Sequence, residues 1–343
     1  MKIAIDAMGG DNAPQSVVDG VLKARDEFKD VEFLLYGDQD QLKALVSNTE
    51  RIEIIHTTEV IDMNDEPVRA IRRKKDSSLV QAAQAVKQGQ ADALFSCGNT
   101  GALLTAGLLI VGRVKGVSRP GLLSTLPILK AGIGDGTFNL LDSGANADSK
   151  PEHLYQYALL GKYYAENVRG LKNPRIGLLN NGTEPHKGSK LTLEAHQLIA
   201  ADKSLNFVGN VESRDLLTGA CDVLVADGFT GNAVLKSIEG TASATLHLLK
   251  DSIMEAGFAG KLGALMLKGV FSELKGKMDQ SQYGGAVLLG AKAPVVKAHG
   301  DSDGLTVYYT LKQIKTMIDG QVVPKFTAYL EELKEDGKAI SKD

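Results

Sequence analysis

The stretch Ser96-Cys97-Gly98-Asn99-Thr100-Gly101 decides how we interpret this chain. It follows the apolar run 91–95, typical of a buried strand, and precedes the apolar segment 102–111, typical of a buried helix. Backbone N–H groups at the start of a helix lack partners and carry partial positive charge. The turn therefore indicates an anion site, in which glycines admit the ligand and Asn99 or Thr100 caps the helix. An ordinary capped turn explains the same residues, because glycine-rich turns recur in α/β folds.

Short apolar runs alternate with helical segments along the chain. Strands are expected at 2–7, 31–36 and 52–56, with helices at 14–27 and 39–47 between them. This order is typical of an α/β fold in which mostly parallel strands carry helices on both faces. Ligands of such folds bind where the strands end, and several strand ends carry polar, glycine-containing turns. These turns are 96–101, 142–146, 181–184 and 227–232, followed by a last one at 299–304.

The composition is that of an ordinary globular protein, with 43% hydrophobic and 24% charged residues among 343. A formal net charge of −3 argues against nucleic acid as the main partner. Two cysteines make no disulfide framework, the first residues are not typical of a signal peptide, and no apolar run is long enough to span a bilayer. We therefore expect a cytoplasmic protein. No metal-ligand spacing occurs, so we expect neither a metal nor a cofactor.

Two regions depart from the alternating pattern. A basic cluster stands before the helix expected at 79–88, and it is either a solvated helix face or a docking surface for an acidic partner. Its members are Arg69, Arg72, Arg73, Lys74 and Lys75. The segment 253–278 has apolar residues at helical spacing between lysines, which indicates an amphipathic helix pair broken at glycines. Such a pair packs on its own core, on a second subunit, or on a membrane surface.

The last polar turn contains a hydrolase-like motif. Gly300-Asp301-Ser302-Asp303-Gly304 has the G-x-S-x-G spacing of a nucleophile elbow. No histidine follows Ser302, so the chain order of an α/β-hydrolase triad is excluded. His299 remains a candidate for proton transfer, because its reference pKa lies near neutrality. Cys97 is either a nucleophile or, as is more usual for a buried cysteine, a small apolar filler.

Seven segments carry a resemblance over nearly the whole chain. They are IAIDAMGGDNAP (3–14), DEPVRAIRRKKDSS (65–78), SCGNTGALLTAGL (96–108), DSGANADSKPEHL (142–154), LLNNGTEPHKGS (178–189), ADGFTGN (226–232) and YGGAVLLGAKAPVVKAHGDSD (283–303). In this order they closely resemble the PlsX family of bacterial phosphate acyltransferases. The resemblance implies transfer of a long-chain fatty acyl group from acyl carrier protein to inorganic phosphate, which gives acyl phosphate for phospholipid synthesis.

The resemblance also implies an architecture. The family is similar in fold to phosphotransacetylases and to isocitrate/isopropylmalate dehydrogenases, with two α/β domains, a cleft between them, and a homodimer. We expect one domain from residues 1–115 and 292–343 and the other from residues 116–291. The family resembles peripheral membrane enzymes, so 253–278 is expected at the membrane. The contact residues would be Phe258, Leu262, Leu265 and Met266.

The resemblance, together with the polar turns, gives a hypothesis for the site. Phosphate would lie at Ser96, Asn99, Thr100 and Gly101, and other cleft residues would be Asp6, Asn146, Thr230, Gly231 and Ser302. Phosphotransacetylases carry an arginine in their final turn, which this chain lacks, so Lys187 would offset the phosphate charge. Asn232, or the backbone N–H groups of Thr230 and Gly231, would stabilise the thioester oxyanion, and His299 would protonate the leaving thiolate or orient phosphate. Asp227 would orient Lys187 or His299, and the basic cluster would dock the carrier protein.

Two other function classes stay open at this point. One is an NAD- and metal-dependent decarboxylating dehydrogenase of the same fold, although the arginine cluster and metal-ligand spacings that it needs are absent. The other is a non-catalytic regulator that binds acyl carrier protein.

Overall fold

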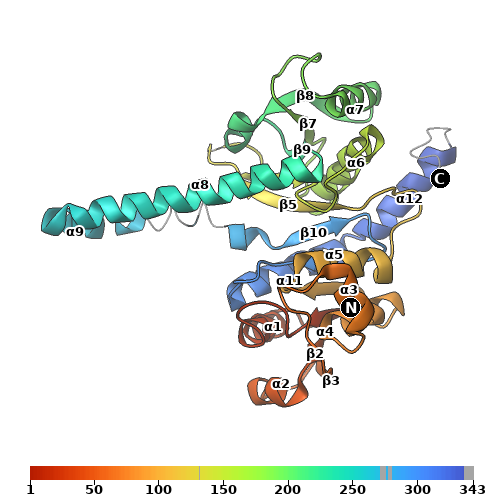
Figure 1. Cartoon of the computed structure of the whole chain (residues 1–343), viewed down its shortest axis with the longest axis vertical. Coiled ribbons are helices and arrows are strands. Elements are labelled where there is room, and N and C mark those ends of the chain that lie inside the picture. Colours follow the sequence, from red (N-terminus) through yellow and green to blue (C-terminus); the bar gives the residue numbers. More distant parts are fainter. Residues whose placement is uncertain (131, 271–275, 277–279, 336–343) are drawn as a thin grey trace.

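One sheet of eleven strands runs through the molecule. The computed structural model describes residues 1–130, 132–270, 276 and 280–335. The strand order is β3-β2-β1-β4-β11-β10-β5-β6-β9-β7-β8 (Figure 1). The strands are β1 (Lys2–Asp6), β2 (Glu32–Gly37), β3 (Ile52–His56), β4 (Ala93–Ser96), β5 (Gly121–Pro127), β6 (Thr137–Leu141), β7 (Arg175–Asn180), β8 (Asn206–Glu212), β9 (Val223–Val225), β10 (Ala286–Leu289) and β11 (Val295–Lys297).

Most neighbouring strands in this sheet are parallel. β3, β2, β1, β4 and β11 are parallel to one another, as are β6, β9, β7 and β8. β10 is antiparallel to both β11 and β5, and β5 is antiparallel to β6. The sheet is therefore continuous across β11 and β10, which fall on opposite sides of the domain boundary expected at 291/292. The division into two domains stays a prediction.

Helices cover both faces of the sheet, as the sequence predicted. They are α1 (Gln15–Glu27), α2 (Gln39–Leu45), α3 (Pro67–Arg73), α4 (Ser78–Lys87), α5 (Thr100–Ala106), α6 (Pro151–Asn167), α7 (Lys190–Ala201), α8 (Gly228–Glu255), α9 (Gly257–Met266), α11 (Gly304–Asp319) and α12 (Val322–Glu335). Short helical turns are η1 (Gly107–Val111), η2 (Ser213–Thr218) and η3 (Gln280–Tyr283). Apolar residues of α1 and α11 pack in one core cluster, and those of α4 and α5 pack in another.

The structure corrects one sequence interpretation and supports another. Glycines and prolines punctuate 114–126, a pattern that by itself favours a crossover between domains, but 121–127 form strand β5 beside β10. Gly121 lets this strand pass close to Tyr157, because a Cβ there would lie 2.8 Å from the ring. The glycine-rich sequence 131–136 precedes an apolar run, which favours a hairpin turn, and the antiparallel pairing of β5 with β6 confirms it; residue 131 itself lies outside the described residues.

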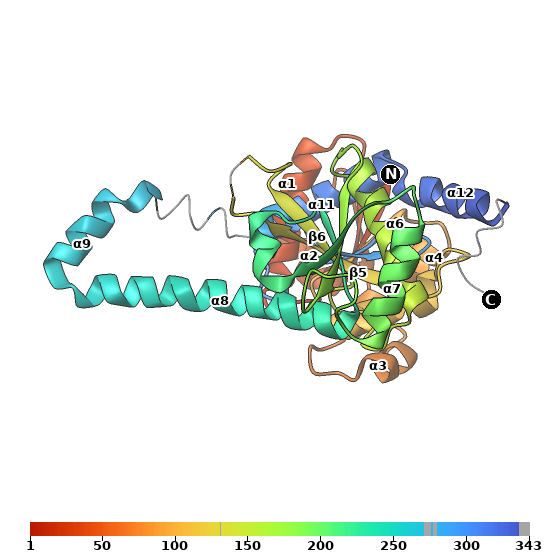
Figure 2. The ribbon, with the colours of Figure 1, turned by 90° about the horizontal axis from the view of Figure 1, so that it is seen from above.

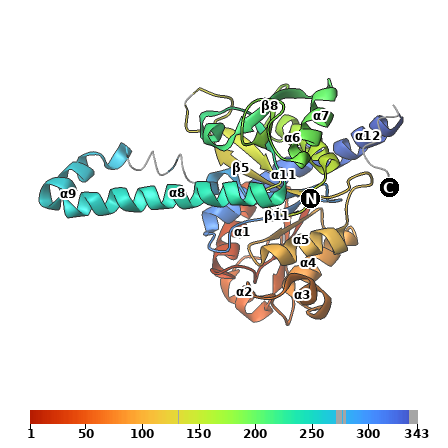
Figure 3. The same cartoon turned by 45° about the horizontal axis from the view of Figure 1, so that its top comes forward.

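An arm formed by α8 and α9 extends from the body of the molecule (Figures 2 and 3). The sequence by itself favours an end of this helix near residue 250, but α8 continues to Glu255. Ala256 separates it from α9, whose first residue, Gly257, has a φ of +65°, a conformation that favours glycine. In the segment 253–278, where a helix pair broken at glycines was expected, the structure describes the last residues of α8 and the helix α9, whereas 271–275 and 277–279 lie outside the described residues. Within the described ranges, no helix combines the length and apolarity that a membrane crossing requires.

The start of α8 is packed tightly against the turn after β6. A Cβ on Gly231 would lie 1.9 Å from the carbonyl oxygen of Asp142, and one on Gly228 would lie 2.6 Å from that of Asn146. Both contacts are with backbone, which cannot move aside cheaply. The first turn of α8 therefore depends on glycine.

We expect Gly231→Ala to lower the free energy of unfolding by roughly 1–3 kcal/mol, because the added methyl group overpacks this contact. Chemical denaturation would measure the change. Gly240→Ala in the same helix is the matched control, since its Cβ would meet nothing within 4 Å. That control should stabilise by up to about 1 kcal/mol through helix propensity. Equal effects at the two positions would contradict the packing argument.

Candidate active site

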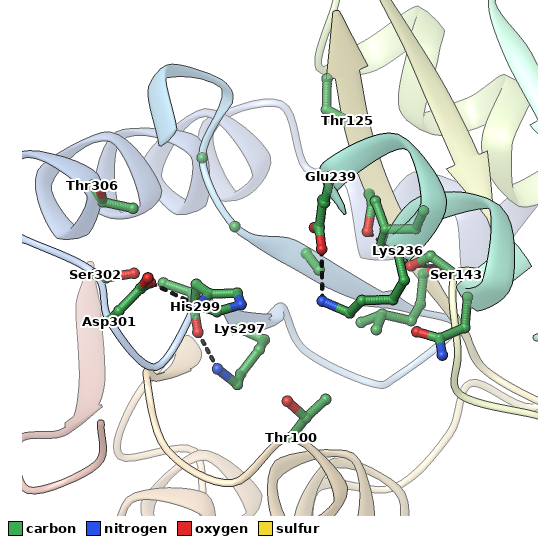
Figure 4. A pocket seen from close by; sticks show the side chains of 18 of the residues that line it. Thr100, Thr125, Ser143, Lys236, Glu239, Lys297, His299, Asp301, Ser302 and Thr306 are labelled. Atoms are coloured by element: carbon green, nitrogen blue, oxygen red, sulfur yellow. Dashed lines mark hydrogen bonds and ion pairs between the residues drawn. The ribbon is translucent and has the colours of Figure 1, made fainter. Parts of the chain in front are cut away.

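A cavity of about 780 Å³ is lined by residues of α8, of β10 and of the turn after β11 (Figure 4). Four of the residues predicted from the sequence line it: Thr100, Asn232, His299 and Ser302. They come from three segments that are far apart in the chain. The polar turns after β4, β9 and β11 therefore contribute to one site, as expected for strand ends in an α/β fold. The roles assigned to them stay predictions.

A buried carboxylate organises the turn after β4. Asp6 Oδ1 accepts a hydrogen bond from Ser78 Oγ at 2.5 Å, and Oδ2 accepts one from Ser96 Oγ at 2.7 Å. Ser96 Oγ in turn accepts one from the N–H of Gly98. Burial raises the pKa of Asp6, and the hydroxyl and backbone hydrogen bonds oppose that rise. Asp6 and Ser96 thus lie beneath the turn and shape it; neither lines the cavity.

Asn99 is engaged by the protein itself. Its Oδ1 accepts a hydrogen bond from the N–H of Ala102, which makes it the N-cap of α5. Its Nδ2 lies within hydrogen-bond distance of three carbonyl oxygens, those of Asp62, Met63 and Asp65. Gly101 faces α3, because a Cβ there would lie 2.5 Å from Pro67. Of the residues predicted in this turn, Thr100 is the one that lines the cavity.

A second buried carboxylate holds the loop that receives α8. Asp142 accepts hydrogen bonds from the backbone N–H groups of Leu122, Gly144, Ala145 and Asn146. The Asn146 amide also donates to Asp142, and it lies within hydrogen-bond distance of the Pro120 carbonyl and the Tyr157 hydroxyl. Burial raises the pKa of Asp142, while its N–H donors lower it. Asn146 thus braces the loop and does not line the cavity.

The first turn of α8 presents Asn232 to the cavity. Asp227 is the N-cap of this helix, and its carboxylate accepts hydrogen bonds from the N–H and hydroxyl of Thr230. Gly231 contacts the loop after β6. One turn further along α8, Lys236 and Glu239 form an ion pair of 2.7 Å on the cavity wall. Asp227, Thr230 and Gly231 therefore position the helix, and Asn232 is the predicted residue that faces the site.

The lysine in the cavity is not the one predicted. Lys187 is exposed in the loop between β7 and α7 and does not line the cavity. Lys297 does line it, with only 8% of its surface exposed. Its Nζ donates to the Cys97 carbonyl at 3.1 Å and to the Ala298 carbonyl. Burial lowers its pKa. The sequence feature that could have identified Lys297 was its position at the end of the apolar strand 295–297.

The turn after β11 contributes the remaining predicted groups. His299 Nδ1 lies 2.6 Å from Asp301 Oδ1, and the imidazole is exposed at the cavity (Figure 4). Ser302 is 4% exposed, and its Oγ makes no hydrogen bond within the described part of the chain. Beside it, Cys97 is almost completely buried, and this burial raises the pKa of its thiol to about 12. A thiol with that pKa is protonated at neutral pH, which favours the apolar-filler interpretation of Cys97.

The basic cluster divides into free and engaged side chains. Arg69, Arg72 and Arg73 are exposed on α3, and beside Glu66 and Val68 they line a surface hollow of about 390 Å³. Lys74 instead donates to Asp65 Oδ2 at 2.6 Å, and this bond raises its pKa. Lys75, which follows α3, donates to the backbone carbonyl of Ile71 in that helix. Within the described residues, the three arginines have no ion-pair partner.

The four residues predicted at the membrane lie on α9 and are all exposed. Phe258 is 83% and Met266 80% exposed, and Leu262 and Leu265 are about half or more exposed. Contiguous exposed apolar side chains of this size mark an interaction surface in a water-soluble protein.

Comparisons with known proteins identify the family. A family model described as a fatty acid synthesis protein matches residues 1–325. The chain is 72% identical over 329 residues to the phosphate acyltransferase of Ligilactobacillus salivarius, covering 96% of this chain and 98% of that relative. It is 60% identical over 331 residues to the phosphate acyltransferase of Enterococcus faecalis, covering 96% and 99%.

Solved structures agree with the fold. A phosphotransacetylase from Streptococcus pyogenes matches 94% of each chain with a TM-score of 0.59 at 16% identity. A branched-chain phosphotransacylase from Enterococcus faecalis covers 93% of this chain with the same TM-score at 17% identity. These likenesses concern the fold alone, whereas the sequence relatives establish descent. The chain therefore belongs to the family of phosphate acyltransferases, as its motifs implied.

Proposed function

We propose that this protein transfers a long-chain fatty acyl group from acyl carrier protein to inorganic phosphate, and that the acyl phosphate feeds phospholipid synthesis. Membership of the family makes the chain an acyltransferase that acts on phosphate. The observation that carries the proposal is the shared cavity, in which Thr100, Asn232, His299 and Ser302 meet. Two reactants held in one such cavity gain from proximity, which can be worth roughly 7–11 kcal/mol of the barrier.

The reaction needs no covalent enzyme intermediate. A phosphate oxygen attacks the thioester carbonyl carbon, the carbon–sulfur bond breaks, and the departing thiolate takes up a proton. We assign stabilisation of the carbonyl oxyanion to Asn232, whose amide can donate into the cavity. We assign the proton to His299, whose Nδ1 is held by Asp301 so that Nε2 is available. The buried thiol of Cys97 is not used.

We expect His299→Gln to lower kcat by about a hundredfold, because it removes the imidazole that gives a proton to the departing thiolate. Steady-state rates with acyl carrier protein substrates would measure the change. His56→Gln is the control, since His56 is an exposed residue at the end of β3 and does not line the cavity. An unchanged kcat in His299→Gln would remove His299 from the mechanism.

The exposed arginines on α3 support a carrier protein as donor. Arg69, Arg72 and Arg73 are free to attract an acidic surface, and charge complementarity raises association rates. The surface is also well placed, because Pro67 of α3 packs against Gly101, the neighbour of cavity-lining Thr100. A carrier docked on α3 would hold its acyl thioester near that end of the cavity.

We expect palmitoyl-acyl carrier protein to release its thiol only when phosphate is added, with acyl phosphate as the product.

A triple variant, Arg69→Glu, Arg72→Glu and Arg73→Glu, should raise the KM for this substrate about tenfold or more, because like charges now face the carrier. The KM for acyl-pantetheine, which lacks the carrier, should stay unchanged.

The matched control places the same charge changes far from α3, at the exposed Lys172, Lys190 and Lys203. An equal rise in KM for both triple variants would mean that only net charge matters.

Carrier binding without phosphate-dependent thiol release would favour a regulator. Loss of turnover in EDTA with NAD-dependent decarboxylation would favour a dehydrogenase.

We also propose that the arm contacts a lipid surface through α9 and that the protein is a homodimer. The exposed Phe258 and Met266 support the membrane contact, because apolar side chains beside lysines suit the lipid interface. The exposed Leu248 of α8 offers apolar surface to a second copy. A monomer mass by light scattering would contradict the dimer.

We expect the double variant Phe258→Glu and Met266→Glu to stop co-sedimentation with vesicles of anionic phospholipid, because carboxylates are repelled and resist burial in the interface. Turnover of dissolved substrate should persist. Leu198→Glu, on the exposed side of α7, is the control for an added charge at an apolar surface position. Unchanged sedimentation of the double variant would exclude α9 as the contact.

A further inference from the structure

Lys297 is a buried cation without a carboxylate partner. It ends β11, directly beside Ser96 at the end of the parallel strand β4. Only 8% of its surface is exposed, and no ion pair involves it within the described residues. Lysine is rarely this buried unless its charge is compensated. The burial of this side chain becomes favourable when an anion pairs with it.

The hydrogen bonds of Lys297 leave one proton unused. An ammonium group has three N–H donors, and two of them are directed at the Cys97 and Ala298 carbonyls. These two carbonyls fix Nζ between the turn after β4 and the turn after β11. The third donor is available to a ligand in the cavity that Lys297 lines (Figure 4).

Ser302 supplies a second unused donor next to the same residue. Its Oγ is buried, has no hydrogen-bond partner within the described residues, and lies on the cavity wall. The group beside it is the Cys97 thiol, which is only a weak hydrogen-bond donor and acceptor and does not satisfy the hydroxyl, and the backbone carbonyl of Cys97 holds Lys297. An unsatisfied buried hydroxyl costs free energy unless a ligand or water completes it. The cavity thus presents two incomplete donors around Cys97.

We propose that Lys297 Nζ and Ser302 Oγ bind the phosphate substrate as an oxyanion. This assignment rests on the proposed function, and it replaces Lys187 as the source of positive charge. The other cavity lysine, Lys236, already pairs with Glu239, so its charge is compensated. A bound phosphate would supply the missing anion for Lys297 and the missing acceptor for Ser302. It would lie beside Thr100 and His299, where the acyl thioester is to be attacked.

The electrostatic environment of Lys297 agrees with this assignment. Burial lowers the pKa of Lys297, whereas Cys97, Asp6, Asp11 and Asp301 raise it. A dianion at hydrogen-bond distance would favour the charged lysine more strongly than these carboxylates. Phosphate binding and full protonation of Lys297 therefore support each other.

The test compares initial rates at varied phosphate and saturating acyl carrier protein substrate. Lys297→Met keeps the length of the side chain and removes its charge, and it should raise the KM for phosphate about tenfold or more. Ser302→Ala is a milder change in a buried position and should raise it about threefold or more. In both variants the KM for the acyl donor should stay near that of the wild type.

Two lysine variants serve as comparisons. Lys292→Met removes an exposed lysine from the loop between β10 and β11, away from the cavity, and should leave the KM for phosphate unchanged. Lys187→Met tests the residue expected from the sequence. A raised KM for phosphate in Lys187→Met, together with a wild-type value in Lys297→Met, would overturn the proposal.

A binding measurement keeps the proposal testable apart from turnover. Inorganic phosphate alone should raise the melting temperature of the wild type, since it binds the folded state, and should not raise that of Lys297→Met. An equal rise of the melting temperature in the wild type and in Lys297→Met would overturn the assignment of phosphate binding to Lys297. Absence of phosphate-dependent thiol release by the wild type would instead refute the proposed function, and the melting comparison would still decide where the anion binds.

Discussion

The parallel pairing of β4 with β11 is the contact on which the site depends. It sets Ser96 opposite Lys297, although 201 positions separate them in the chain. Because parallel strands end at the same edge of a sheet, the turns that follow must meet there. Thr100 and Ser302 reach one cavity for this reason. A register change between these two strands would move both turns and leave no common site.

Three carboxylates near the cavity hold the backbone and are not available to a ligand. Asp6 fixes the turn after β4, Asp142 fixes the turn after β6, and Asp227 caps α8. Buried polar groups of this kind are costly when unpaired, which explains why each has several donors. In contrast, the Ser302 hydroxyl makes no hydrogen bond within the described residues, and the charge of Lys297 is not compensated by a carboxylate there. These two groups are therefore available to bind a ligand.

Sequence patterns were sufficient for the fold class and for the position of the polar turns. Apolar runs ending in glycine and small polar residues locate strand ends without reference to the rest of the chain. They do not show which side chain within a turn faces a ligand. Asn99 illustrates this, because its amide is taken up by the loop 62–65, which no local pattern links to residue 99. Lys297 illustrates the converse, since a lysine at the end of an apolar strand gives no sign that it lies in a cavity until the neighbouring strand is known.

The helix α8 begins on the cavity wall and ends close to the tip of the arm. Its twenty-eight residues form one unbroken rod of about 42 Å, at 1.5 Å per residue. Because the length of this helix is fixed, the cavity lies at a fixed distance from any surface that the tip of the arm contacts. An anchor at α9, as proposed above, would therefore be separated from the reacting groups by a distance that the helix itself determines.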